Sequence, residues 1–120
     1  MAEERDVTLG AVTPVQSPAE REIDAWRRRI DQIDTQLMRL LNSRSACAVE
    51  VGRIKAELGL PIYMPEREGE ILERVMRENP GPLDPLAVRR VFERIIDESR
   101  RLERVAAEKS HDVAQEQNQE

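Results

Sequence analysis

The apolar residues of the chain predict one long amphipathic helix over residues 18–58. They recur at the steps of three and four that share one helix face, at Ile23, Trp26, Ile30, Ile33, Leu37, Leu40, Leu41, Ala48, Val51 and Leu58. The stretch SPAE at 17–20 offers an N-cap serine, a proline at the first helical position and a glutamate for a capping box. Gly59, with Pro61 just beyond it, is typical of a helix end.

Two shorter helices are predicted after this one. The second opens at Pro65 and runs to Pro80, with an apolar face made of Ile71, Leu72, Val75 and Met76. The stretch NPGPLDP at 79–85 is a turn. Its last two residues, Asp84 and Pro85, form a second pair of an N-cap residue and a proline, which is typical of a helix start. The third helix carries Leu86, Val91, Phe92, Ile95, Ile96, Leu102 and Ala106 on its apolar face. The predicted fold class is therefore all-α, with one very long helix and two shorter ones.

The same pattern divides the chain into three parts. Residues 1–16 show no sustained period and are expected to form a mobile arm. Residues 17–107 form the helical domain. Residues 108–120 are polar and aromatic-free, so we expect this tail to fray or to be disordered.

The length of the first helix predicts a dimer. A helix over residues 18–58 would be about 60 Å long, whereas a compact globule of this chain length has a radius of gyration of roughly 14 Å. One chain cannot cover such a stripe, and we expect three helices per chain to intertwine with those of a second copy in a homodimer.

Composition narrows the possible functions. The formal net charge of −5 argues against a nucleic-acid partner, whose footprint is a basic face. No apolar run approaches the roughly 20 residues of a membrane span, and the first residues lack the layout of a secretory signal. A single cysteine and a single histidine argue against a disulfide framework, a metal site and a Cys–His catalytic pair. We therefore expect a cytoplasmic protein with no metal and no cofactor.

Cations occupy positions in the first helix where the period calls for an apolar residue. Each residue turns a helix by about 100°, so Lys55 falls at about 0° and Arg44 at about −20° from Leu37, the centre of the stripe. Arg27 lies on the flank of the stripe, at about 80°.

The two shorter helices repeat this feature. Glu68 is in line with the apolar face of the second helix, and Arg67 lies on its flank. On the third helix Ser99 follows Ile95 by four residues, and Glu103 follows Ser99 by another four.

An unpaired buried charge is too costly for a small domain, so these groups must meet each other or a ligand. One alternative is a buried ion-pair network, such as Lys55–Glu103 or Arg44–Glu68. Over the whole set, however, cations outnumber anions in an otherwise acidic protein. This surplus predicts that the ligand is an anionic small molecule.

Spacing along the first helix locates that molecule. Arg44 and Lys55 are about 16 Å apart along the axis, so their long side chains can converge on a ligand above Ala48, Val51 and Gly52. Arg27 lies about 25 Å from Arg44 and cannot easily reach this ligand within its own chain. In an antiparallel dimer the partner's Arg27 could reach it, which predicts two equivalent sites, each completed by the other subunit.

Together these residues resemble the all-helical, AroQ-type chorismate mutase family. The resemblance covers roughly residues 20–105 and rests on IDAWRRRIDQIDTQLMRLLNSR, on AVEVGRIK, on the RE pair of PERE and on RIIDES. It implies an intertwined dimer with two active sites. It also implies an enzyme, an isomerase that converts chorismate to prephenate by a Claisen rearrangement on the shikimate-pathway route to phenylalanine and tyrosine.

The resemblance also assigns roles to the basic residues. Arg44 and the partner's Arg27 look like the clamps on the two carboxylates of the substrate. Lys55 resembles the family lysine that contacts the ether oxygen and a carboxylate, and Arg67 belongs to the same basic set.

The remaining matched residues are acidic or hydroxylic. Glu68 looks like the group that binds the ring hydroxyl of chorismate, and Ser99 resembles a hydroxyl near a carboxylate. Glu103 stands at the position of the second group that faces the ether oxygen. Because an ionised carboxylate would repel this oxygen, Glu103 is expected to act in its protonated form, and activity is expected to fall as the pH rises.

Three alternatives stay open from the sequence. The first is isochorismate-pyruvate lyase, a sister activity on the same scaffold. The second is a non-catalytic helical dimerisation module, which accounts for the long stripe but not for cations on it. The third is regulation by a partner enzyme of the shikimate pathway, on which some small members of the family depend.

Overall fold

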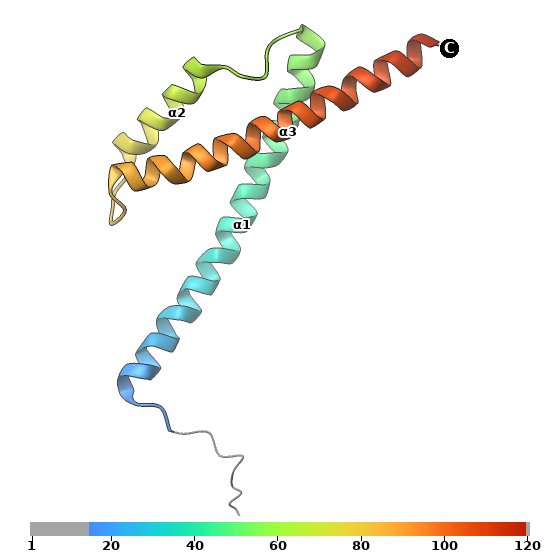
Figure 1. Cartoon of the computed structure of the whole chain (residues 1–120). Helices are drawn as coiled ribbons and strands as arrows, with labels where there is room; N and C mark the ends of the chain where they lie inside the picture. The colour runs from blue at the N-terminus through green and yellow to red at the C-terminus, as the bar shows by residue number, and fades with distance from the viewer. Residues whose placement is uncertain (1–14, 120) are drawn as a thin grey trace, which may run out of the picture. The chain divides into compact units, whose positions relative to one another are not determined.

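The computed structural model describes residues 15–119. It contains the helices α1 (Pro18–Leu58), α2 (Pro65–Glu78) and α3 (Pro85–Gln119), and no strand within the described range. Figure 1 shows them in chain order. The predicted all-α fold with one very long helix is confirmed. The predicted mobile arm at 1–16 lies outside the described residues, except for residues 15 and 16.

A reciprocal capping box begins α1. The Ser17 Oγ accepts a hydrogen bond from the Glu20 amide at 3.1 Å, and the Ser17 amide donates to the Glu20 carboxylate at 2.9 Å. Two of the amides that every helix start leaves unpaired are satisfied in this way. The hydrogen bond from the Ser17 amide, followed by the one with its side chain, lowers the pKa of the Glu20 carboxyl below its ordinary value.

A left-handed glycine ends α1. Gly59 has a φ of +67°, a conformation that residues with a Cβ rarely adopt. It turns the chain so that the Leu60 amide donates to the Lys55 carbonyl at 2.8 Å and the Gly59 amide to the Ala56 carbonyl at 3.3 Å. These two bonds form a Schellman motif, which satisfies carbonyls of the last helical turn.

The predicted starts of the two other helices are also confirmed. Pro65 is the first residue of α2, after the non-capping residue Met64. Asp84 caps α3, since its Oδ1 accepts a hydrogen bond from the Ala87 amide at 2.9 Å.

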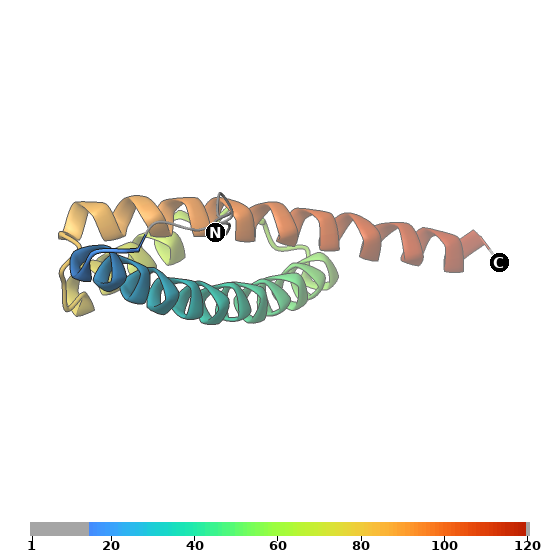
Figure 2. The same cartoon turned by 90° about the horizontal axis from the view of Figure 1, so that it is seen from below.

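The prediction of a frayed or disordered tail from residue 108 is wrong for its described part. The helix α3 continues to Gln119, and Figure 2 shows it extending toward the C-terminus as one rod. Residues 108–119 contain no glycine or proline, and many are alanine, glutamate, glutamine or lysine, which are strong helix formers. Because these residues are polar, the tail has no apolar face to pack, but its helical propensity remains high. The prediction of disorder gave too much weight to polarity.

The chain divides into two units, Met1–Arg39 and Leu40–Glu120, and α1 contributes to both. In the second unit α2 and α3 pack against each other, and the last part of α1 contacts α3 (Figure 1). Each of the three helices buries one hydrophobic side chain here, Ala48, Ile71 and Ile96, at 6% to 8% exposure. This small core holds the three helices around the cavity described below.

In the first unit the apolar stripe of α1 is open to solvent. Its residues Ile23, Trp26, Ile30, Ile33 and Leu37 are 40% to 67% exposed. A contiguous exposed apolar face of this length is unusual on a monomer and is typical of a protein–protein contact. Among residues 15–119, no helix is both long enough and apolar enough to cross a membrane.

Candidate functional site

A cavity of about 260 Å³ opens between the last part of α1, α2 and α3 in the second unit. The three buried core residues, Ala48, Ile71 and Ile96, form part of its apolar wall. Its charged and hydroxylic lining residues are Arg44, Lys55, Arg67, Glu68, Ser99, Arg100 and Glu103. The structure therefore brings together six of the seven residues predicted from the sequence, and adds Arg100.

Lys55 and Glu103 form the predicted ion pair across α1 and α3. The Lys55 Nζ lies 2.6 Å from the Glu103 Oε1, and both side chains are largely shielded, at 12% and 15% exposure. The same Nζ donates to the Ile62 carbonyl at 3.0 Å, which ties the α1–α2 linker to the cavity. An ammonium group has three N–H donors, so one remains for a ligand among these contacts.

Gly52 is the point where α3 packs against α1. A Cβ at this position would lie 2.5 Å from the Glu103 Cα and 2.8 Å from the Glu103 carbonyl carbon. The sequence analysis placed the ligand above Gly52, and this is wrong, because the α3 backbone fills that space. The close crossing instead brings the Glu103 side chain within reach of Lys55.

Arg44 donates a short hydrogen bond to the Ser99 Oγ, and this hydroxyl in turn donates to the Ile95 carbonyl at 3.0 Å. The pKa of Arg44 is lowered, first by burial and then by the positive charges of Arg67 and Arg74, against a smaller opposing effect of Glu103. The guanidinium thus sits in a field with a surplus of positive charge. An anion bound beside it would relieve this surplus.

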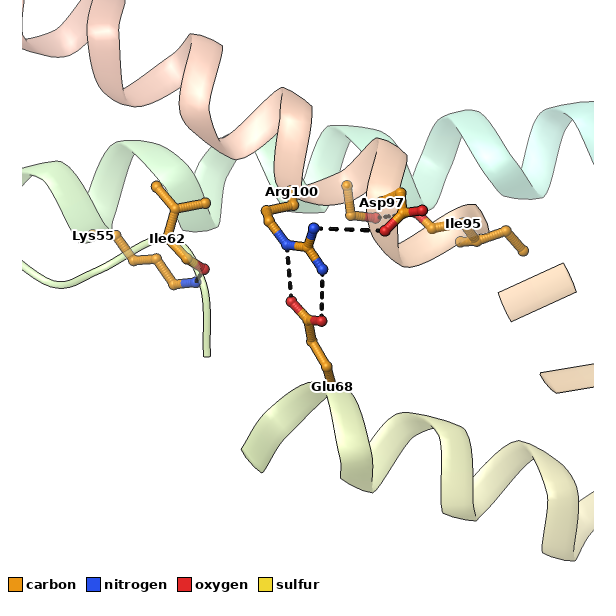
Figure 3. Close-up of polar contacts among 7 residues, drawn as sticks. Lys55, Ile62, Glu68, Ile95, Asp97 and Arg100 are labelled. Atoms are coloured by element: carbon orange, nitrogen blue, oxygen red, sulfur yellow. Dashed lines mark hydrogen bonds and ion pairs between the residues drawn. The ribbon is translucent and has the colours of Figure 1, made fainter. Parts of the chain in front are cut away.

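Glu68 pairs with Arg100 and not with Arg44, so the predicted alternative Arg44–Glu68 pair is wrong. Figure 3 shows the guanidinium of Arg100 on α3 facing the carboxylate of Glu68 on α2. The Nε–Oε2 distance is 3.1 Å and the Nη2–Oε1 distance is 2.7 Å, a bidentate arrangement. The Arg100 Cζ also lies 5.1 Å from the ring centroid of Tyr63.

Two of the predicted arginines are more loosely held. Arg67 lines the cavity, but its side chain is 60% exposed. Its ion pair with Glu70 is long, at 3.8 Å. Arg27 belongs to the first unit, with a side chain that is 73% exposed and 4.0 Å from Asp24. It does not line the cavity.

Arg100 was missed by the sequence analysis, although a signal for it exists. It follows the buried Ile96 by four residues, the same spacing from Ile95 that drew attention to Ser99. The Ile62 carbonyl was missed as well, and because it is a main-chain atom in a linker, no side-chain pattern could have indicated it.

The charges that line the cavity do not balance. Four cations, Arg44, Lys55, Arg67 and Arg100, face two anions, Glu68 and Glu103. The excess of two positive charges favours a ligand with two negative ones. Within residues 15–119, no group of three or more His, Cys, Asp or Glu side chains is placed to hold a metal ion.

Parts of all three helices are similar in sequence to known proteins. Residues 26–104 match the family model described as chorismate mutase type II. A bifunctional chorismate mutase/prephenate dehydratase from Pseudomonas aeruginosa is 40% identical over 87 residues, which cover 68% of this chain and 24% of that protein. A chorismate mutase from Methanocaldococcus jannaschii is 41% identical over 51 residues, which cover 42% of this chain and 52% of that protein.

The arrangement of the helices is also similar to a solved structure. The chorismate mutase (form II) from Thermus thermophilus matches with a TM-score of 0.67 and 40% identity, over 68% of this chain and 93% of that one. The chain spans only 16% to 24% of the length of the bifunctional curated relatives it matches. The similarity therefore covers only part of each of these bifunctional relatives.

Proposed function

This chain belongs to the chorismate mutase type II family, and we propose that it converts chorismate to prephenate by a Claisen rearrangement, on the route to phenylalanine and tyrosine. One observation carries the proposal. Arg44 and Lys55 on α1 and Glu103 on α3 line a single cavity whose charged residues leave two positive charges unbalanced. Chorismate, a dicarboxylate, supplies the two negative charges that this cavity lacks.

The reaction suits a site without a nucleophile. A pericyclic rearrangement breaks the ether C–O bond and forms a C–C bond within one molecule, with no obligatory proton transfer. Catalysis must hold the enolpyruvyl side chain over the ring in a near-attack conformer. It must also stabilise the negative charge that grows on the ether oxygen as its bond breaks. A fixed set of hydrogen-bond donors around a dicarboxylate does both.

Arg44, Lys55 and Glu103 are the residues to which we assign these tasks. Arg44 clamps one carboxylate, and its hydrogen bond to Ser99 fixes the guanidinium beside the cavity. Lys55 directs its remaining N–H toward the ether oxygen, held in place by the Ile62 carbonyl and Glu103. Glu103 faces the same oxygen, and as the anion of the ion pair it holds the Lys55 ammonium there. It would itself donate a hydrogen bond to the oxygen only in a substrate complex that has taken up a proton.

The other lining residues bind the substrate without touching the reacting bond. We assign the ring hydroxyl to Glu68, because an ionised carboxylate is an acceptor and a hydroxyl is a donor. Ser99 lies beside the carboxylate that Arg44 holds. Arg67 adds positive charge at the exposed edge of the cavity, where 60% of its side chain is open to solvent.

A second copy of the chain is proposed to complete each site. The exposed stripe of α1 in the first unit needs a partner to cover it, and Arg27 lies on this helix with a side chain that is 73% exposed. In an antiparallel dimer, the partner's Arg27 would enter the cavity and hold the second carboxylate. We also propose a cytoplasmic location, which suits the free thiol of Cys47.

The loss of chorismate absorbance in the presence of the purified protein tests the proposal. We expect turnover by the wild type and a loss of about a hundredfold to a thousandfold in kcat/KM for Arg44→Ala, the range typical of removing one preorganised donor. Arg53→Ala is the matched control on the same helix. Its guanidinium pairs with Glu50 at 3.2 Å and Glu57 at 2.6 Å, away from the cavity, so its activity should equal that of the wild type.

Product analysis decides between the proposal and its rivals. Prephenate as the sole product from chorismate supports the mutase. Salicylate and pyruvate from isochorismate would instead identify the lyase. If neither substrate is turned over, no dicarboxylate raises the Tm, and Arg44→Ala stabilises the fold, then the chain is a dimerisation module.

A further inference from the structure

Arg100 differs from the other cations of the cavity in that a bidentate pair with one carboxylate holds its guanidinium. Its Nε and Nη2 bind the two carboxylate oxygens of Glu68 at 3.1 and 2.7 Å, and its Nη1 lies 3.5 Å from Asp97. Figure 3 shows these three contacts around one guanidinium. They raise the pKa of Arg100, with the hydrogen bond to Glu68 as the largest cause.

The Arg100 guanidinium also lies over an aromatic ring. The distance from the Arg100 Cζ to the Tyr63 ring centroid is 5.1 Å. A cation within about 6 Å of the face of an aromatic ring is attracted to it, which helps to hold the guanidinium in place. The α1–α2 linker, α2 and α3 therefore all hold Arg100 in one orientation.

Glu68 is fixed by the same contacts but keeps free acceptor sites. A carboxylate has about four lone-pair directions, of which the bidentate pair with Arg100 occupies two. The Glu68 side chain is 20% exposed and lines the cavity, so its remaining lone pairs are available to a ligand donor. Held as an anion, Glu68 favours a ligand hydroxyl over a ligand carboxylate at this end of the cavity.

We infer that Arg100 is a positioning residue, which orients Glu68 to accept a hydrogen bond from the ring hydroxyl of chorismate and does not itself bind a substrate carboxylate. The inference rests on the proposed function. It assigns a role to Arg100, which was not predicted from the sequence. It also separates the four cavity cations into two kinds. Arg44, Lys55 and Arg67 bind the ligand, whereas Arg100 holds Glu68, which binds it.

A double-mutant cycle on activity tests the inference. Arg100→Met and Glu68→Gln should each lower kcat/KM for chorismate by about tenfold to a hundredfold, as expected for a lost charge-assisted hydrogen bond. If Arg100 acts through Glu68, the double variant should lose no more than about threefold beyond Glu68→Gln alone. Losses that multiply would mean that Arg100 contacts the substrate directly, and would overturn the inference.

A substrate analogue gives a second readout that a purely structural role would not move. In this analogue hydrogen replaces the ring hydroxyl of chorismate, and both carboxylates and the enolpyruvyl ether remain. Wild type and Arg100→Met should rearrange it at rates within about threefold of each other, since Glu68 has no hydroxyl to bind. A loss as large as that with chorismate would contradict the proposed role.

Arg101→Met is the matched control, because it removes the same charge from the next residue of α3. The Arg101 side chain is 57% exposed and pairs with Glu98 at 3.0 Å, outside the cavity. Its kcat/KM for chorismate should equal that of the wild type. A loss similar to that of Arg100→Met would show a general effect of charge on this helix and would overturn the inference.

Thermal unfolding gives a readout that needs no substrate. It compares the wild type, Arg100→Met, Glu68→Gln and the double variant. If the pair forms, the Tm lost in the double variant should be clearly smaller than the sum of the two single losses. Additive losses would overturn the coupling between Arg100 and Glu68. A folded wild type that leaves chorismate unchanged would instead overturn the proposed function, so the two failures are distinguishable.

Discussion

Gly52 of α1 and Glu103 of α3 meet backbone to backbone, so closely that a Cβ on Gly52 would lie 2.5 Å from the Glu103 Cα. Three residues after this crossing, Lys55 reaches the Glu103 carboxylate at 2.6 Å. The helix packing and the proposed catalytic pair thus depend on the same contact. The absence of a side chain at residue 52 thus positions the two residues that we propose to face the ether oxygen.

Gly52→Ala should therefore impair both folding and catalysis. The added methyl group meets main-chain atoms, which cannot move aside as the end of a flexible side chain can, so α1 and α3 must separate. We expect a loss of about 1 to 3 kcal/mol in the free energy of unfolding and a lower kcat with chorismate, measured by urea denaturation and by the chorismate assay.

Gly69→Ala is the control for this substitution. Gly69 lies within α2, and a Cβ there would meet nothing within 4 Å. Alanine should stabilise the helix by about 0.5 to 1 kcal/mol relative to glycine. If both variants behaved alike, helical propensity alone would explain the result, and the close crossing would have no special role.

Much of the fold could be predicted because its signals are local. The capping box at Ser17 and Glu20, the glycine stop at Gly59 and the proline starts at Pro65 and Pro85 each depend on residues within one or two turns. The continuation of α3 to Gln119 was missed because polarity was treated as a sign of disorder, whereas helical propensity decides the local structure there.

The site was predictable as a set of residues but less so as a set of pairs. Helical periodicity identifies which positions share a face, so Arg44, Lys55 and Ser99 could be expected at the cavity. Which anion meets which cation depends on how the helices cross, and this depends on details such as Gly52. Periodicity therefore left the Lys55–Glu103 and Arg44–Glu68 pairs equally open, and only the first forms.

The start of α1 should weaken in acid. The pKa of Glu20 is lowered in the folded chain by its hydrogen bonds with Ser17, so the folded state favours the ionised form. This contribution to stability is fully present above the pKa that Glu20 has in the unfolded chain, and it is lost as the pH falls through the lower, folded value. The protection factors of the Glu20 and Arg21 amides against hydrogen exchange should fall over this range in the wild type, whereas in Glu20→Gln they should stay nearly constant.

Mixed dimers test whether Arg27 acts across the proposed interface. Arg27→Ala and Arg44→Ala homodimers should each be nearly inactive, because every site lacks one carboxylate clamp. In a heterodimer of the two variants, one site has its own Arg44 and the partner's Arg27, while the other site lacks both. Unfolding and refolding an equal mixture should therefore restore about a quarter of the wild-type activity, since half of the dimers are mixed and each has one intact site.

If Arg27 acted within its own chain, no site in any dimer would be intact and refolding would restore nothing. The same mixture without unfolding, in which subunits have not exchanged, is the control that assigns the recovered activity to heterodimers.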